Sequence, residues 1–248
     1  MPVDLSSRPQ APYLLPDHWV LHKTKPDDTF TVLHSAYISW VVSILKAAKV
    51  KTVLEVGCGD GWACNEMVKA GLKVVGTDFI QNAITYASTL VPGAEFICGD
   101  LASEEFKMRF PDKFDAIAMI EVLEHIPPIE CVSALRNIIE PLKSGGLFVL
   151  TTPSENFPND NIHHYQHFTE NKLSDLVKQA GDLEILSIEG YGDVEIERSH
   201  WNKMRWFDNR YYSIKPGIRM LNRRFADAKL IKTPLSRSHG LVAVMRKA

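Results

Sequence analysis

The stretch from residue 53 to residue 61 constrains the fold of this chain more than any other. It reads Val-Leu-Glu-Val-Gly-Cys-Gly-Asp-Gly, so a short apolar segment leads directly into three glycines at alternate positions. Residues 52–56 have the character of a buried parallel strand, and residues 62–71 repeat apolar side chains at helical spacing. Glycines between a strand and a helix allow positive φ and a close approach to a ligand. The stretch therefore predicts a ligand-binding turn in an α/β fold.

The spacing of the glycines separates the ligands that bind at such turns. Gly57, Gly59 and Gly61 alternate with other residues and follow the acidic Glu55. Dinucleotide-binding proteins typically carry Gly-x-Gly-x-x-Gly instead. The spacing favours a ligand other than a dinucleotide.

Two acidic residues end the next two predicted strands. The strand at 73–78 ends at Asp78, about twenty residues beyond the turn, where a carboxylate can accept hydrogen bonds from ribose hydroxyls. The strand at 95–100 ends at Asp100, which suits the amino group of an adenine. The two acids indicate a ligand that contains adenosine.

With these features the chain resembles the class I S-adenosylmethionine-dependent methyltransferases, over roughly residues 51–180 and the last strand. Further predicted strands lie at 114–121, 145–153 and 183–189, and a Leu-Lys-Ser-Gly-Gly turn typical of the family precedes the second of them. Crossover helices are predicted at 80–90, 103–110, 130–142 and 169–180. The resemblance implies a doubly wound, mostly parallel seven-stranded sheet whose last strand, 240–246, is antiparallel. A similar sheet that binds NAD or another adenosine ligand is the alternative.

The resemblance also implies which residues bind S-adenosylmethionine. Gly57, Gly59 and Asp78 occupy positions that hold the methionyl and ribose parts in this family, and Asp100 with Leu101 would flank the adenine. The full predicted set is Glu55, Gly57, Gly59, Gly61, Asp78, Phe79, Asp100, Leu101 and Glu121.

Acids and histidines gather after the fourth and fifth predicted strands, where a ligand of a parallel sheet binds. The cluster consists of Glu121, Glu124, His125, His163, His164 and His167. The first three share one side if the turn after the fourth strand is helical. Because an imidazole can take a proton from a hydroxyl near neutral pH, His125 and His167 are the predicted catalytic residues.

The Glu-x-x-Glu-His spacing within this cluster resembles two groups of methyltransferases. In the ubiquinone-pathway O-methyltransferases and the small-RNA 3′-end ribose methyltransferases, corresponding residues are reported to hold a metal. Carboxylates and imidazoles could bind a divalent Mg²⁺ or Mn²⁺ here. The motif also occurs in relatives without a known metal, and residues 162–168 lack the Arg and Trp of the RNA enzymes. A metal-free site is favoured, and no metal ligand is assigned.

Segment composition divides the chain into a domain with two additions. The 248 residues are 45% hydrophobic, which suffices for one buried core. Residues 29–190 with 239–248 form the predicted methyltransferase domain, and residues 1–28 an irregular N-terminal arm or lid over the cofactor. Residues 191–238 form an insert with eleven basic and five acidic residues and several aromatic ones. The insert could cap the substrate, or its aromatic side chains could simply form a small core of its own.

We predict an O-methyltransferase that acts on a hydroxylated small or medium-sized molecule, such as a sugar or other glycan-related acceptor. The alternatives are an RNA ribose 2′-O-methyltransferase, an N-methyltransferase and a non-catalytic module that binds an adenosine ligand. A net charge of −2 counts against a dedicated RNA-binding protein.

Cellular location and assembly are less constrained by the sequence. Residues 1–16 lack the basic start and apolar run of a secretion signal, and the longest apolar run near them, 37–45, is too short to cross a bilayer. The four cysteines form no Cys-x-x-Cys pair and are expected to be reduced. These features predict a cytoplasmic protein. They do not bear on its oligomeric state.

Overall fold

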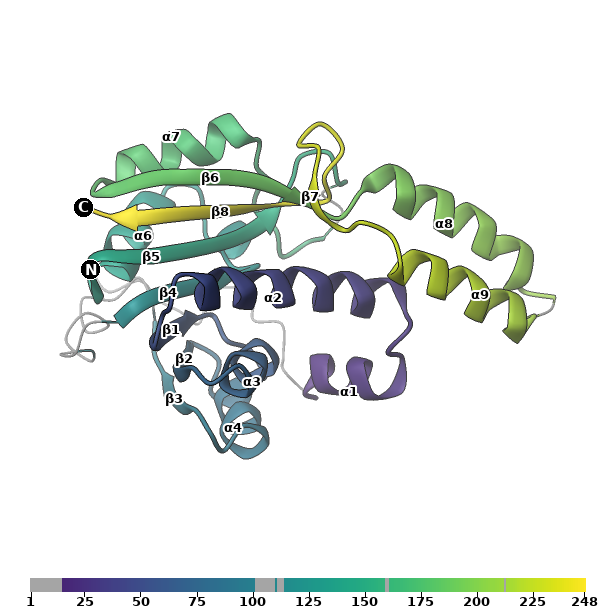
Figure 1. Ribbon diagram of the computed structural model, residues 1–248, viewed down its shortest axis with the longest axis horizontal. Helices are drawn as coiled ribbons and strands as arrows, with labels where there is room; N and C mark the ends of the chain where they lie inside the picture. The colour runs from purple at the N-terminus through teal and green to yellow at the C-terminus, as the bar shows by residue number, and fades with distance from the viewer. Residues whose placement is uncertain (1–14, 101–109, 111–113, 159–160, 212) are drawn as a thin grey trace.

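The computed structural model describes residues 15–100, 110, 114–158, 161–211 and 213–248. A central sheet carries helices on both faces, and its described strands follow the order β3-β2-β1-β4-β5-β8-β6-β7 (Figure 1). The strands are β1 (Thr52–Val56), β2 (Lys73–Asp78), β3 (Glu95–Cys98), β4 (Phe114–Ile120), β5 (Leu142–Pro153), β6 (Leu183–Tyr191), β7 (Ile231–Thr233) and β8 (Gly240–Lys247). The helices are α1 (Asp17–Thr24), α2 (Thr29–Ala47), α3 (Trp62–Lys69), α4 (Gln81–Leu90), α6 (Cys131–Ile139), α7 (Glu170–Ala180), α8 (Val194–Phe207) and α9 (Lys215–Ala226), with the short 3-10 helix η2 (Leu123–His125).

The predicted parallel core of the sheet is confirmed. β1 and β2 begin and end at the predicted residues, and β1 to β5 pair in parallel. β5 begins earlier than predicted, because Leu142 pairs with Phe114 before an irregularity in the register. β8 runs antiparallel between β5 and β6, as the family resemblance implied. The helix predicted at 103–110 lies outside the described residues, apart from Phe110.

The sheet has one strand more than predicted. β7 pairs antiparallel with the end of β6 and forms the edge of the sheet, within the segment assigned to the insert. Its three residues, Ile-Lys-Thr, are too few for an alternating pattern to be recognised in the sequence. Exposed Lys232 at its centre is typical of edge strands, where a charge discourages pairing with another chain.

The expectation of an irregular arm before residue 28 is corrected by α1. None of the α1 residues is buried, so the helix has no apolar face from which it could have been predicted. Contacts with a distant residue hold it in place. The backbone N–H of His18 donates to Oδ2 of Asp60 at 2.9 Å, and Nε1 of Trp19 donates to the carbonyl of Asp60 at 3.0 Å.

Alternate residues of the central strands face two separate cores. On one face, Leu54 of β1 and Ile117 of β4 pack with residues of α6 and α7. On the other face, Val53 and Ala118 pack with α2 and α3. Ala118 is a small residue of β4 and leaves room for α2, which crosses this face of the sheet in Figure 1. The sheet is therefore covered on both sides, as a parallel sheet requires.

By length and composition alone, α2 could cross a membrane, and it is the one such helix among the described residues. In the structure it lies against the sheet and belongs to the core, with Tyr37, Trp40, Val41 and Leu45 buried. Packing thus accounts for its apolar composition.

The insert is helical, as predicted. α8 and α9 lie side by side at one end of the sheet, and α9 packs against α2 (Figure 1). The aromatic residues of the insert divide into two groups: Phe225 is buried, whereas Trp206 is 75% exposed and Tyr211 76% exposed. The helices leave the sheet beyond β6, and Asp193 caps the first turn of α8 through the N–H groups of Glu195 and Ile196.

Candidate active site

A cavity of about 520 Å³ opens at the carboxyl ends of β1, β4 and β5. Its walls come from α1, α2, the glycine turn after β1, the turn after β4, the loop after β5 and the residue that precedes β8. Ligands of open α/β sheets bind at this edge. The fold therefore brings the glycine turn and four residues of the Glu/His cluster, Glu121, Glu124, His125 and His164, to one site.

The glycine turn has the backbone that its sequence predicts. Gly57, Gly59 and Gly61 have φ of 74°, 52° and 81°, which few residues with a side chain adopt. A Cβ on Gly57 would lie 2.3 Å from Cγ2 of Val122, so the turn is packed closely against the chain after β4. Gly61 is the N-cap of α3. Gly57 and Gly59 thus present backbone without a side chain to the cavity, whereas Gly61 is absent from its wall.

Asp78 stabilises this turn from behind. Its Oδ2 accepts a hydrogen bond from the N–H of Gly59 at 3.0 Å, and its Oδ1 accepts one from the N–H of Ile80 at 2.9 Å. Burial raises the pKa of Asp78, although these hydrogen bonds oppose the shift. Asp78 is absent from the wall of the cavity. Sequence reasoning assigned this residue to the ribose and missed its role in shaping the turn.

The other predicted cofactor-binding residues fall into three groups. Glu55, Gly57, Gly59 and Glu121 line the cavity. Phe79 and Asp100 are half-buried beyond the ends of β2 and β3 and do not line it. Leu101 lies outside the described residues.

Glu55 is a buried carboxyl group whose second oxygen has no described partner. Only 2% of the residue is exposed, and Oε2 makes no hydrogen bond within the described part of the chain. Burial raises the pKa of Glu55 to about 7. A cationic group in the cavity would satisfy this oxygen and favour the ionised form. The residues present therefore fit the amine of a methionyl group.

The turn after β4 differs from the helical turn that was assumed for the cluster. Glu121 has a φ of 53°, and the 3-10 helix η2 begins only at Leu123. The backbone bend directs Glu121 toward Thr151, whose Oγ1 donates to Oε1 of Glu121 at 2.8 Å. Positive φ at a residue with a side chain is strained and persists where neighbouring contacts enforce it. Glu121 and Glu124 still reach the same cavity, although by different routes.

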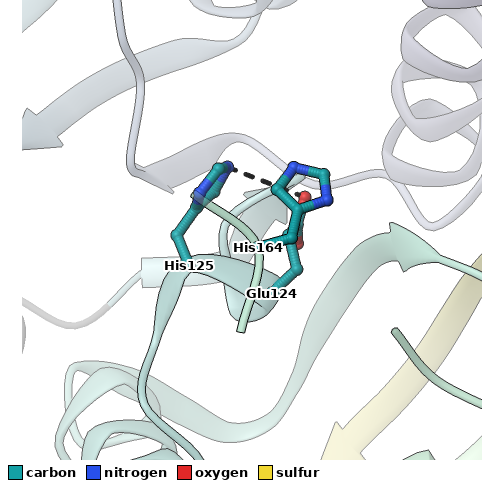
Figure 2. A group of neighbouring side chains, drawn as sticks. All are labelled: Glu124, His125 and His164. Carbon is teal, nitrogen blue, oxygen red and sulfur yellow. Dashed lines mark ion pairs between the residues drawn. The ribbon is translucent and has the colours of Figure 1, made fainter. Parts of the chain in front are cut away.

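Glu124, His125 and His164 form a compact group on the wall of the cavity (Figure 2). One possible ligand atom from each lies within 4.8 Å of the others, and Nε2 of His125 is 3.9 Å from Oε1 of Glu124. Burial and the neighbouring Glu121 raise the pKa of Glu124 well above its usual value. The group could hold a divalent cation or the hydroxyl of a substrate.

A backbone carbonyl fixes the orientation of the His125 ring. Nδ1 of His125 lies 3.0 Å from the carbonyl oxygen of His163, which can only accept, so Nδ1 carries the hydrogen. Burial lowers the pKa of His125, and its neutral ring then presents Nε2 as an acceptor. This is the form that the predicted catalytic role requires.

His167, the other predicted catalytic residue, stands behind His164 and does not line the cavity. Its Nδ1 donates to the carbonyl of Phe157 at 3.0 Å, so its Nε2 accepts from Nδ1 of His164 at 2.9 Å. This chain of contacts sets the orientation of His164. The geometry favours a positioning role for His167, and its role as a proton acceptor stays a prediction.

Three histidines on the cavity wall, His18, His34 and His239, were absent from the predicted set. His18, from α1, pairs with Oδ1 of Asp60 at 3.1 Å. Burial disfavours the charged form of His18, but the hydrogen bond and charge of Asp60 outweigh it and raise the pKa. His239 precedes β8, which starts at this edge because it is antiparallel. That topology is the signal by which His239 could have been found, since prediction considered only residues after parallel strands.

Together, the mostly parallel sheet, its antiparallel β8 and the glycine turn at the cavity define the Rossmann-like fold of class I S-adenosylmethionine-dependent methyltransferases. The sequence profile of a methyltransferase-domain family matches residues 31–188, and the chain belongs to that family.

Similar proteins agree with this assignment. A ubiquinone biosynthesis O-methyltransferase from Ralstonia nicotianae is 32% identical over 122 residues, which cover 47% of this chain and 51% of that protein. The chain thus spans about half the length of this relative. Magnesium protoporphyrin IX methyltransferase from Synechocystis has a similar structure, with a TM-score of 0.60 at 15% identity over 94% of each chain. The small RNA methyltransferase HEN1 has a TM-score of 0.61 at 13% identity, over 86% of this chain and 25% of that one. At these identities the two structures show a shared fold.

We predict that Glu55 makes binding of the methyl donor depend on pH. Because its pKa in the donor-free protein is about 7, Glu55 must lose a proton before it can pair with a cationic amine. We expect donor affinity to fall by up to about tenfold for each pH unit below 7. Calorimetry between pH 5.5 and 7.5 measures this. The Glu55→Gln variant should bind weakly with little pH dependence, and an equally steep dependence in that variant would assign the effect to another group.

Proposed function

We propose that this protein transfers the methyl group of S-adenosylmethionine to a hydroxyl group of a small or medium-sized molecule. One observation carries the proposal: the glycine turn and the group of Glu124, His125 and His164 line the same cavity. A donor on the turn and an acceptor beside the imidazoles would then lie within one site.

Some residues around this cavity would bind the donor, and others would bind the acceptor. Glu55 would hold the amine of the donor, while the glycine turn, held by Asp78, would lie against its methionyl and ribose parts. The donor supplies an electrophilic methyl group, so the protein has to align the acceptor and take up its proton. Nε2 of His125 is available for a hydrogen bond from the hydroxyl, and His167 would keep His164 oriented.

Two features support a hydroxyl rather than an amine as the acceptor. Two relatives of similar sequence carry the name ubiquinone biosynthesis O-methyltransferase. In addition, the wall presents several groups that can accept a hydrogen bond, whereas a neutral amine attacks without a base. A sugar or other glycan-related acceptor is the finer proposal, and the polar side chains of the wall are compatible with it.

The arm and the insert have different relations to the cavity. His18 of α1 lines it and is tied to Asp60 of the glycine turn, which supports the proposed lid over the donor. None of the described residues of α8 and α9 lines it. The role of the insert as a substrate cap therefore stays a proposal that would require movement of these helices.

Incubation with donor labelled in its methyl group tests the proposed function. The acceptors are catechol, methyl α-glucoside, phenethylamine and a short single-stranded RNA. We expect label in catechol or methyl α-glucoside. Label only in phenethylamine would establish N-methylation and overturn the proposal. Donor binding by calorimetry without label in any acceptor would favour a non-catalytic binding module.

An RNA ribose 2′-O-methyltransferase is the second candidate, because Glu124, His125 and His164 could bind a divalent cation. Gel-shift measurements with the same RNA at low and moderate salt test it. RNA binding driven by phosphate contacts weakens steeply as salt rises. Absence of a complex at low salt would exclude this candidate.

A further inference from the structure

His239 lies on the cavity wall with a carboxylate directly behind it. Nδ1 of His239 is 2.8 Å from Oε2 of Glu197 on α8. A carboxylate oxygen accepts hydrogen bonds, so Nδ1 carries the hydrogen of this contact and Nε2 is the ring nitrogen left to act as an acceptor. The side chain of His239 is 18% exposed and that of Glu197 is 9% exposed, so water screens the pair little.

The surrounding residues hold this pair in place. The N–H of Asp193 donates to Oε1 of Glu197 at 3.2 Å, which fixes the carboxylate. The ring of Phe157 stacks on that of His239 with centroids 3.9 Å apart, and the carbonyl of His239 accepts from the N–H of Ser154 at 2.8 Å. Both ends of the pair are thereby positioned before any ligand binds.

Gly192 permits the close approach of the two residues. Its φ is 64°, and a Cβ there would lie 2.4 Å from Cβ of His239 and 3.0 Å from Oε1 of Glu197. A side chain at this position would push the pair apart. The path of the chain from β6 into the insert thus places Glu197 directly behind His239 on the cavity wall.

We propose that His239 is the group that takes the proton of the acceptor hydroxyl, and that Glu197 is its positioning residue. This inference rests on the proposed O-methyl transfer. As the hydroxyl oxygen forms a bond to the methyl carbon, the carbon–sulfur bond breaks and its electron pair stays on sulfur. The hydroxyl proton passes to Nε2 of His239, and the imidazolium is stabilised by the carboxylate of Glu197.

The partners of the two imidazoles explain why His239 takes the proton rather than His125. Nδ1 of His125 donates to a neutral carbonyl, whereas Nδ1 of His239 donates to a carboxylate. A hydrogen bond to a charged partner is stronger, and a carboxylate behind an imidazole stabilises the charge that proton uptake creates. His125 then serves as a hydrogen-bond partner of the acceptor. The inference also gives the insert a task, because α8 supplies Glu197.

Histidine NMR of the full chain tests the arrangement without turnover. In the ¹⁵N-labelled protein, the resonances that disappear in His239→Gln belong to His239. We expect them to show hydrogen on Nδ1 and a bare Nε2, and we expect this pattern to change in Glu197→Gln. A hydrogen on Nε2 of neutral His239 would overturn the proposal, whether or not any acceptor has been methylated.

Kinetics with the methylated acceptor of the panel test the proton transfer. We expect His239→Gln to lower kcat by about a hundredfold or more, and Glu197→Gln by about tenfold or more, with KM and donor affinity changed by less than about threefold. His200→Gln is the matched control, because His200 is a buried histidine of α8 away from this cavity. Added imidazole should partly restore His239→Gly.

The possible failures can be distinguished. A kcat of His239→Gln within about threefold of the parent would overturn the inference while O-methylation stands. If the parent methylates no hydroxyl of the panel, the proposed function fails, and the NMR measurement still decides whether the pair exists as described.

Discussion

Replacement of Gly57 by valine is expected to abolish binding of the methyl donor, with a loss of affinity of about a hundredfold or more. A single Cβ at this position would lie 2.3 Å from Val122, and the backbone φ of 74° is unfavourable for a β-branched residue. The left-handed conformation costs about 1–2 kcal/mol, and overpacking typically costs about 1–3 kcal/mol more. The turn would relieve both by moving toward the donor position. Calorimetry with S-adenosylmethionine measures the effect.

Gly145 offers a matched control for this substitution. It has the same φ of 74°, but a Cβ there would meet no atom within 4 Å, and it lies at the opposite end of β5 from the cavity. Gly145→Val should therefore lose some stability and keep its donor affinity. Equal donor affinities in the two variants would show that Gly57 does not belong to the donor site.

Strands and helices with buried, contiguous apolar residues were predictable from the sequence. β1 and β2 match their predicted bounds because every inner position of a central parallel strand is covered on both faces, which leaves a short apolar run between polar turns. Both ends of α7 were predictable for a similar reason. Thr169 accepts from the N–H of Lys172 at the start of the helix, and Gly181 follows its end with a φ of 82°. These signals are local, so the sequence alone displays them.

Elements held by distant contacts were not predictable in this way. α1 is fixed by hydrogen bonds from His18 and Trp19 to Asp60, which lies about forty residues further along the chain. β7 is a strand only because β6 lies beside it. No local pattern reports such a partner.

The candidate site shows the same division. The glycine turn and Glu55 were predicted from the sequence, since one short stretch contains them. The histidines of the loop after β5 could not be ranked, because spacing does not reveal that His164 faces the cavity while His167 stands behind it. Glu197 lies in a helix remote in sequence from every predicted site residue, and only the fold brings it to His239.

The second large effect concerns His125. We expect His125→Gln to lower kcat by about a hundredfold while donor affinity changes by less than about threefold, because we propose that Nε2 positions the acceptor rather than the donor. Steady-state kinetics with the methylated acceptor and calorimetry with the donor measure the two quantities. His163→Gln is the control. His163 contributes its backbone carbonyl to His125, and this contact survives the substitution. Near-normal turnover of His125→Gln would indicate an acceptor that needs no polar contact here, such as an amine.

A chelation experiment then separates the two chemical roles open to His125. If Glu124, His125 and His164 bind a cation, EDTA abolishes turnover of the parent protein and Mn²⁺ restores it. The His125→Gln variant would in that case need a higher Mn²⁺ concentration, since a cation site that loses one of its three protein ligands binds more weakly. If the group binds the acceptor directly, EDTA leaves the parent unchanged and Mn²⁺ rescues nothing in the variant. Because donor affinity is expected to stay constant in both cases, the response to Mn²⁺ identifies whether the imidazole contacts a hydroxyl or a metal.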